Sequence, residues 1–79
     1  IMTENQIIKI LLKINPELKK YLHKNVDLLN NGFLDSFSII QLILKLEQTS
    51  NKKINFSKIK RSDFASLKNI VKFVNKKNP

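Results

Sequence analysis

The chain has no cysteine and no tryptophan, and it has only one histidine, one glycine and two prolines among its 79 residues. Without cysteine it forms no disulfide, no thiolate metal site and no thiol nucleophile of its own. A single histidine, His23, cannot by itself supply a metal site or a catalytic triad, so we expect neither. No apolar run exceeds four residues, and the N-terminus lacks the apolar centre of a signal peptide. These absences predict a cytoplasmic protein without a membrane span.

Length and helix-breaking residues together predict one small helical domain. A chain of 79 residues has room for a single hydrophobic core, so we expect one domain over residues 1–79. Met2 is the expected natural start, with Ile1 as an extra residue in front of it. Because glycine and proline interrupt helices and are scarce here, the predicted fold class is all-α, a small bundle of three to four helices.

Residues that favour helix N-termini place the expected helices. Thr3 with Gln6 three residues later is typical of a capping box, and apolar residues follow at helical spacing. The pair Asn15-Pro16 predicts a second, short helical segment, because proline fits the first position of a helix. The remaining expected segments are a helix from Ser36 to Thr49 capped by Asp35, one turn over Ser57–Arg61, and a last helix capped by Ser66 before a frayed tail over 75–79.

Two stretches without helical periodicity are expected to be loops. Residues 25–34 contain the turn signal Asn-Asn-Gly, and residues 51–53 interrupt the apolar pattern after the middle helix. Val26, Leu28 or Leu29 of the first loop are expected to point inward. Ile54 and Phe56, which follow residues 51–53, are expected to point inward and anchor the second loop.

The predicted middle helix has more apolar side chains than one contact with a core can cover. At about 100° per residue they fall into two stripes on different faces. The stripes are Ile39, Leu42, Ile43 and Leu46 on one side and Phe37, Ile40 and Leu44 on the other. We expect the first stripe to line either a filled core or a groove, and the second to stay exposed and bind a partner. The alternative is that another helix of the bundle covers the second stripe.

The residues around the start of the middle helix resemble the phosphopantetheine attachment motif of acyl carrier proteins. They read Asp27-Leu28-Leu29-Asn30-Asn31-Gly32-Phe33-Leu34-Asp35-Ser36-Phe37, in which glycine lies three residues before an Asp-Ser-Leu-like triplet. The resemblance covers nearly the whole chain, because it continues through Ile39-Ile40-Gln41-Leu42-Ile43, Leu46-Glu47, Ile54 and Phe64-Ala65-Ser66-Leu67. The amino-acid sequence of residues 32–37 is most similar to the corresponding segment of the stand-alone D-alanyl and related aminoacyl carriers.

The resemblance implies a carrier without catalytic residues of its own. The hydroxyl of Ser36 would accept 4′-phosphopantetheine from coenzyme A, and the thiol of that group would hold an acyl or aminoacyl cargo as a thioester. A serine in the first turn of a helix also places an attached phosphodiester near unpaired backbone N–H groups and the positive end of the helix dipole. Asp35 is an N-cap by position, and the resemblance adds a contact with the metal ion used by the transferase. Gly32 is expected for a positive φ or for a close approach of two chain segments.

The partners that the resemblance implies are a phosphopantetheinyl transferase, a ligase that loads the acyl or aminoacyl group, and a downstream acyltransferase or synthase. The surface expected to meet them consists of Phe37, Ile40, Gln41, Leu44 and Glu47. The middle helix is usually acidic in this family, whereas here it is nearly neutral, with Gln41, Lys45 and Gln48. We therefore expect docking through apolar contacts with little electrostatic steering.

Two interpretations other than a modified carrier stay open, and the first of them comes from the net charge. The formal charge is +9, divided into +1 over residues 1–40 and +8 over residues 41–79, as in a basic helical domain that binds nucleic acid. One arginine and few aromatic residues are poor equipment for reading or stacking bases, so we expect no nucleic-acid partner. Lysine beside abundant asparagine and isoleucine is also typical of A/T-rich coding. The remaining interpretation is a carrier-like interaction module that is never modified.

Overall fold

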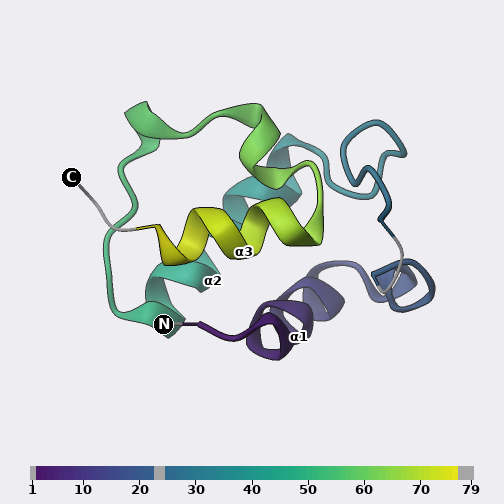
Figure 1. Ribbon diagram of the computed structural model, residues 1–79, viewed down its shortest axis with the longest axis horizontal. Helices are drawn as coiled ribbons and strands as arrows, with labels where there is room; N and C mark the ends of the chain where they lie inside the picture. The colour runs from purple at the N-terminus through teal and green to yellow at the C-terminus, as the bar shows by residue number, and fades with distance from the viewer. Residues whose placement is uncertain (1, 23–24, 77–79) are drawn as a thin grey trace.

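The computed structural model of the protein describes residues 2–22 and 25–76. It has three α-helices, which are α1 (Glu4–Ile14), α2 (Ser36–Ser50) and α3 (Leu67–Asn75) (Figure 1). The connecting segments contain three 3₁₀ turns, which are η1 (Pro16–Lys20), η2 (Phe56–Lys58) and η3 (Arg61–Phe64). No strand occurs within the described ranges, and the prediction of a small all-α bundle with three main helices is confirmed.

The first two helical segments begin where their capping residues predict. Thr3 Oγ1 accepts a hydrogen bond from the Gln6 backbone N–H at 3.2 Å, and Gln6 Oε1 accepts one from the Thr3 N–H at 2.8 Å. The capping box of α1 is therefore complete. Asn15 follows α1 and caps η1, because its Oδ1 accepts from the Glu17 N–H at 3.1 Å. Pro16 comes next and has no backbone N–H to leave unpaired.

The two longer downstream helices also begin as predicted. α2 starts at Ser36 and ends one residue later than expected, at Ser50. Asn51 stops this helix by adopting the left-handed conformation, with φ of 57°, which asparagine tolerates better than most residues. α3 starts after Ser66, whose Oγ accepts a hydrogen bond from the Asn69 N–H at 3.1 Å.

The segment between α2 and α3 has two turns instead of the single turn predicted over residues 57–61. Each turn has its own polar cap. Asn55 Oδ1 accepts from the Ser57 N–H at 3.0 Å, and Asp63 Oδ2 accepts from the Lys60 N–H at 2.9 Å. Short local hydrogen bonds of this kind compete with a continuous helical turn and divide the segment into η2 and η3.

This segment is anchored to the core by Phe64 and not by Phe56. Phe64 is fully buried, and the centroid of its ring lies 5.3 Å from that of Phe73 in α3. Phe56 is 56% exposed, so the expectation that it points inward is wrong. The second turn explains the difference, because η2 has no buried residue and stays on the surface, whereas Phe64 is buried at the end of η3. Ile54 is half-buried and packs against the core, as expected.

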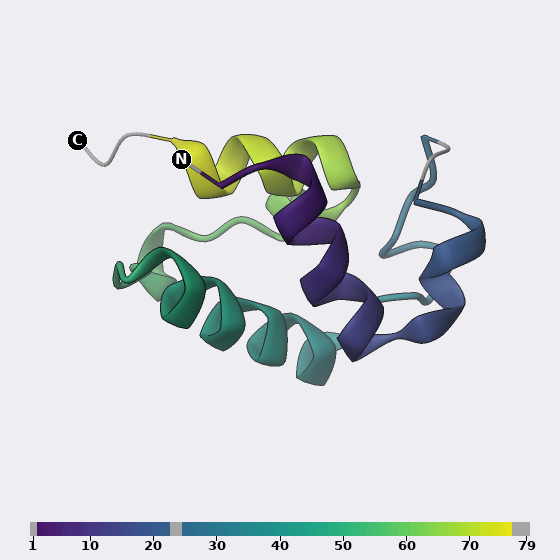
Figure 2. The ribbon, with the colours of Figure 1, turned by 90° about the horizontal axis from the view of Figure 1, so that it is seen from below.

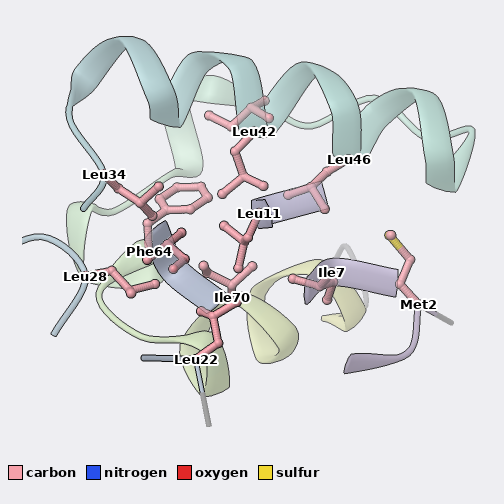
Figure 3. Close-up of a cluster of buried hydrophobic side chains, with 12 residues drawn as sticks. Met2, Ile7, Leu11, Leu22, Leu28, Leu34, Leu42, Leu46, Phe64 and Ile70 are labelled. Carbon is pink, nitrogen blue, oxygen red and sulfur yellow. The ribbon is translucent and has the colours of Figure 1, made fainter. Parts of the chain in front are cut away.

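α1 packs against both other helices, while α2 and α3 run in the same direction along opposite sides of the molecule (Figure 2). One cluster of buried side chains lies between them. Figure 3 shows Leu42 and Leu46 pointing from α2 toward Leu11 of α1, with Phe64 and Ile70 beside them. All five side chains are fully buried, and burying one such side chain contributes ~1.5–3 kcal/mol. The first stripe of α2 therefore faces a filled core and does not line a groove.

The two ends of the described chain are joined by one side chain. Asn75 Oδ1 accepts a hydrogen bond from the Met2 N–H, and Asn75 Nδ2 donates one to the Met2 carbonyl, both at 2.9 Å. The expectation that the chain frays from residue 75 onward is thus wrong at its first residue, which is held to the other end of the fold. Residues 77–79 of the expected tail, together with Ile1 and His23, lie outside the described residues.

Candidate functional site

Ser36 is the first residue of α2, and its side chain is exposed. The preceding residue, Asp35, caps the helix, because its Oδ1 accepts a hydrogen bond from the Ser38 N–H at 2.8 Å. The first N–H groups of a helix have no partner within the helix, and the positive end of the helix dipole lies there. The Ser36 hydroxyl thus lies at the surface beside a region that stabilises negative charge.

The carboxyl group of Asp35 titrates below its ordinary range. Hydrogen bonds from Ser38, first from its backbone N–H and then from its side chain, lower the Asp35 pKa below the usual 3.8. Both bonds favour the charged form because a carboxylate accepts them more strongly than a protonated acid does. Asp35 therefore caps α2 as an anion at neutral pH.

This charge predicts a pH-dependent difference between the wild type and Asp35→Asn. The Asp35 pKa is lower in the folded chain than in the unfolded chain, so the charged carboxylate stabilises the fold above pH 3.8. This stabilisation is lost as the pH falls through the pKa that Asp35 has in the folded chain. Asparagine keeps an oxygen that can cap the helix but carries no charge for the dipole. We expect the wild type to have the higher Tm at neutral pH and the difference to close in acid, as measured by circular dichroism. A difference that stays constant with pH would contradict this role.

Asp27 organises the loop that precedes Ser36. Its Oδ1 accepts hydrogen bonds from the backbone N–H of Leu29 at 3.0 Å and of Asn30 at 2.9 Å, and its Oδ2 accepts one from Asn30 Nδ2 at 2.7 Å. Its carbonyl oxygen accepts a further bond from Asn31 Nδ2 at 2.9 Å. This role of Asp27 was not predicted from the sequence, although an aspartate that bonds to the backbone two residues later is a recognisable turn signal.

The same loop is attached to the rest of the fold at both sides. The Leu28 N–H donates to the Ala65 carbonyl at 2.7 Å, and the Leu28 carbonyl accepts from the N–H groups of Phe33 and Leu34, both at 3.0 Å. Asn15 Nδ2 donates to the Phe33 carbonyl at 3.2 Å, which links the loop to the start of η1. Leu28 is the buried member of the three candidate anchors, and Leu34 is buried with it. The loop is therefore held in one shape directly before the exposed serine.

Gly32 lies in this loop with φ of 74°. A Cβ atom added at Gly32 would have no other atom within 4 Å, so a close approach of two segments does not require glycine here. Of the two expected reasons for this residue, the positive φ is the correct one. Residues with a side chain pay ~1–2 kcal/mol in this conformation.

α2 turns an apolar face toward solvent, and we call Phe37, Ile40 and Leu44 the exposed apolar face. Their side chains are 69%, 49% and 50% exposed, respectively. The prediction that the second stripe stays exposed is confirmed, and the alternative that another helix covers it is wrong for the described residues. At ~1.5 Å per residue this face begins beside Ser36 and extends about 10 Å along α2. Gln41, which is exposed as well, borders it.

Glu47, the remaining residue of the expected partner surface, has a contact within the chain. It is half-buried, and its Oε2 accepts a hydrogen bond from the Ile54 N–H at 2.7 Å. The bond ties the last turns of α2 to the loop that follows the helix. The structure therefore gives Glu47 a role in holding this loop, while the exposed apolar face and Gln41 remain open to solvent.

Two features are absent from the described part of the chain. Within residues 2–22 and 25–76, no group of three or more His, Cys, Asp or Glu side chains could hold a metal ion. No helix of this part of the chain is long and apolar enough to cross a bilayer.

The chain matches no family model, no curated protein and no solved structure. No relative therefore supplies a function for the site around Ser36.

Proposed function

We propose that this chain is an acyl or aminoacyl carrier protein that carries 4′-phosphopantetheine on Ser36. The observation that supports the proposal most directly is the exposed Ser36 side chain in the first turn of α2. The preceding loop is organised by hydrogen bonds to Asp27 and by the positive φ of Gly32, and Ser36 lies exposed a few residues after it. A modifying enzyme can therefore reach the hydroxyl without opening the bundle.

Attachment forms one phosphodiester at Ser36. The Ser36 Oγ attacks the phosphate of coenzyme A that bears pantetheine, the bond to the adenosine 3′,5′-diphosphate half breaks, and the hydroxyl proton passes to a base of the transferase. The positive end of the α2 dipole then faces the negative phosphodiester. By resemblance to known carriers, Asp35 contacts the metal ion of the transferase. The attached group supplies the thiol that the chain lacks, and this thiol holds the cargo as a thioester.

The filled core favours a small cargo that stays outside the bundle. Leu42, Leu46 and Phe64 are fully buried in the cluster that a long acyl chain would have to enter. Forcing additional methylene groups into a packed core costs ~1–3 kcal/mol. An aminoacyl or short acyl group avoids this cost, in agreement with the resemblance of residues 32–37 to aminoacyl carriers.

The exposed apolar face supports the partner set that a carrier needs. It begins one residue after Ser36, so an enzyme that acts on the arm also meets this face. The proposed partners are a phosphopantetheinyl transferase, a loading ligase, and a downstream acyltransferase or synthase. Contacts with exposed aromatic and aliphatic side chains contribute binding energy at such surfaces.

Labelling in vitro tests the proposal. The purified chain is incubated with coenzyme A and, in parallel, with two phosphopantetheinyl transferases of different substrate preference, and its intact mass is measured. We expect the mass of one phosphopantetheine group to be added. No added mass with either enzyme, under conditions that label a control carrier completely, would contradict the proposal.

The same preparation distinguishes the other two interpretations. A nucleic-acid-binding domain would gain no mass and would bind duplex DNA with an affinity that falls steeply with salt. An unmodified interaction module would gain no mass and show no such DNA binding, and its exposed apolar face would be the remaining functional surface.

A further inference from the structure

A groove of about 330 Å³ runs between α1 and α2, next to the exposed apolar face. Its lining residues are Lys9, Ile10, Lys13 and Ile14 from α1 and Gln41, Lys45, Gln48 and Thr49 from α2. The two helices that form its walls pack against each other. Six of its eight lining residues are polar or cationic, and the other two are isoleucines.

The charge of the groove is of one sign. Three of its lining residues are lysines, and no aspartate or glutamate is among the described residues that line it. Lys9 and Lys13 are four residues apart on α1, so they lie on the same face one turn from each other. Like charges at this spacing repel each other by a few tenths of a kcal/mol. An anionic group between them and Lys45 would remove this repulsion.

The groove and the exposed apolar face form one continuous surface. Around the circumference of α2, Gln41 and Gln48 lie between the exposed apolar face and Lys45. A partner that rests on Ile40 and Leu44 therefore meets the glutamines next and the lysines after them. The surface thus has an apolar part, a neutral polar border and a cationic part in that order.

We propose that this surface binds an acidic amphipathic helix of a partner protein. A helix fits a groove between two helices, and its apolar side chains would cover the exposed apolar face. Carboxylates one turn apart on its flank would lie opposite Lys9 and Lys13, which have the same spacing. A nucleic-acid backbone would satisfy the lysines but has no apolar side chains to cover Phe37, Ile40 and Leu44.

The lysines of α1 alter the expectation that partners dock with little electrostatic steering. The sequence of α2 alone contributes a single cation, Lys45, at the partner surface. α1 brings two more to the same groove, and these are separated from Lys45 in sequence by more than thirty residues. The partner surface is therefore cationic, and attraction to an acidic partner should speed their association. The proposal does not depend on modification of Ser36.

The test uses a designed pair of peptides and the unmodified, isotope-labelled chain. One peptide is a helix with leucines along one face and glutamates along its flank, and its twin has lysine in place of every glutamate. Binding is followed by nuclear magnetic resonance as shifts of backbone amide signals. We expect the acidic peptide to shift signals of Lys9, Lys13 and Leu44, with an affinity that falls as salt is raised, and the basic twin to shift none.

Charge reversal at matched positions distinguishes binding in this groove from general electrostatic attraction between the acidic peptide and a basic protein. We expect Lys9→Glu with Lys13→Glu to weaken binding of the acidic peptide about tenfold or more. The control, Lys68→Glu with Lys72→Glu, changes the net charge equally at two exposed lysines with the same spacing on α3, and should leave the affinity within about twofold. Circular dichroism checks that both variants are folded.

Four outcomes would overturn the proposal. They are equal binding of the two peptides, equal loss in the two double variants, no shift with the acidic peptide, and tighter binding of a DNA duplex than of the acidic peptide at the same groove. Because Ser36→Ala should bind the peptide as the wild type does, failure of phosphopantetheine labelling leaves this result unaffected. The two proposals can therefore fail separately.

Discussion

We expect a chain carrying Ser36→Ala to gain no mass when it is incubated with coenzyme A and a phosphopantetheinyl transferase under the conditions expected to label the wild type. The substitution removes only the exposed hydroxyl to which the phosphodiester would be attached. Alanine has a higher helix propensity than serine, so α2 should persist. We therefore expect complete loss of labelling with an unchanged helical signal, measured by intact mass and by circular dichroism.

Ser38→Ala is the matched control for this loss. Ser38 is two residues further along the same turn of α2, and its contribution to the cap through its backbone N–H survives the substitution. We expect the Ser38 variant to be labelled to the same final extent as the wild type. Labelling of the Ser36 variant would place the attachment at another residue and refute the assignment.

Phe64→Ala should remove a large part of the stability of the fold. Phe64 is fully buried, and its ring packs beside that of Phe73. Removing a buried phenylalanine side chain typically costs ~3–5 kcal/mol, whereas a chain of this length has a total stability of about 4–12 kcal/mol. The variant should therefore unfold at a much lower urea concentration than the wild type, or lack a cooperative transition altogether.

Phe56→Ala provides the control with the same chemical change. Phe56 belongs to the neighbouring turn but is largely exposed, so its truncation should alter the unfolding free energy by no more than about 0.5 kcal/mol. Urea unfolding followed by circular dichroism gives both values. Similar losses in the two variants would mean that the core is not anchored at Phe64.

Local signals in the sequence were sufficient to place the helices. Thr3, Asn15, Asp35 and Ser66 each accept the predicted capping bond from a backbone N–H two or three residues away. Hydrogen bonds of this range depend only on residues nearby in the chain, so the sequence alone is sufficient to predict them. The two stripes of α2 were equally predictable, because the angle between side chains on a helix is fixed.

Contacts between distant parts of the chain were not predictable in this way. Phe56 and Phe64 have similar local surroundings, and only the packing of η3 against α3 determines which one is buried. The bond between Glu47 and the Ile54 N–H, seven residues later, holds a half-buried carboxylate against the loop after α2, whereas helical periodicity alone left this side chain free for a partner. Lys9 and Lys13 join Lys45 only because α1 packs beside α2. Each case requires the tertiary arrangement, which periodicity does not provide.

The paired hydrogen bonds between Asn75 and Met2 make the backbone almost a closed ring. Both ribbon views place this junction away from the start of α2 (Figures 1 and 2). A circularly permuted gene that joins these ends and opens the chain at the exposed residues 51–53 would leave residues 2–50 uninterrupted. We expect such a permuted chain to keep the geometry around Ser36, because the new ends would lie after the last residue of α2 and Ser36 is its first.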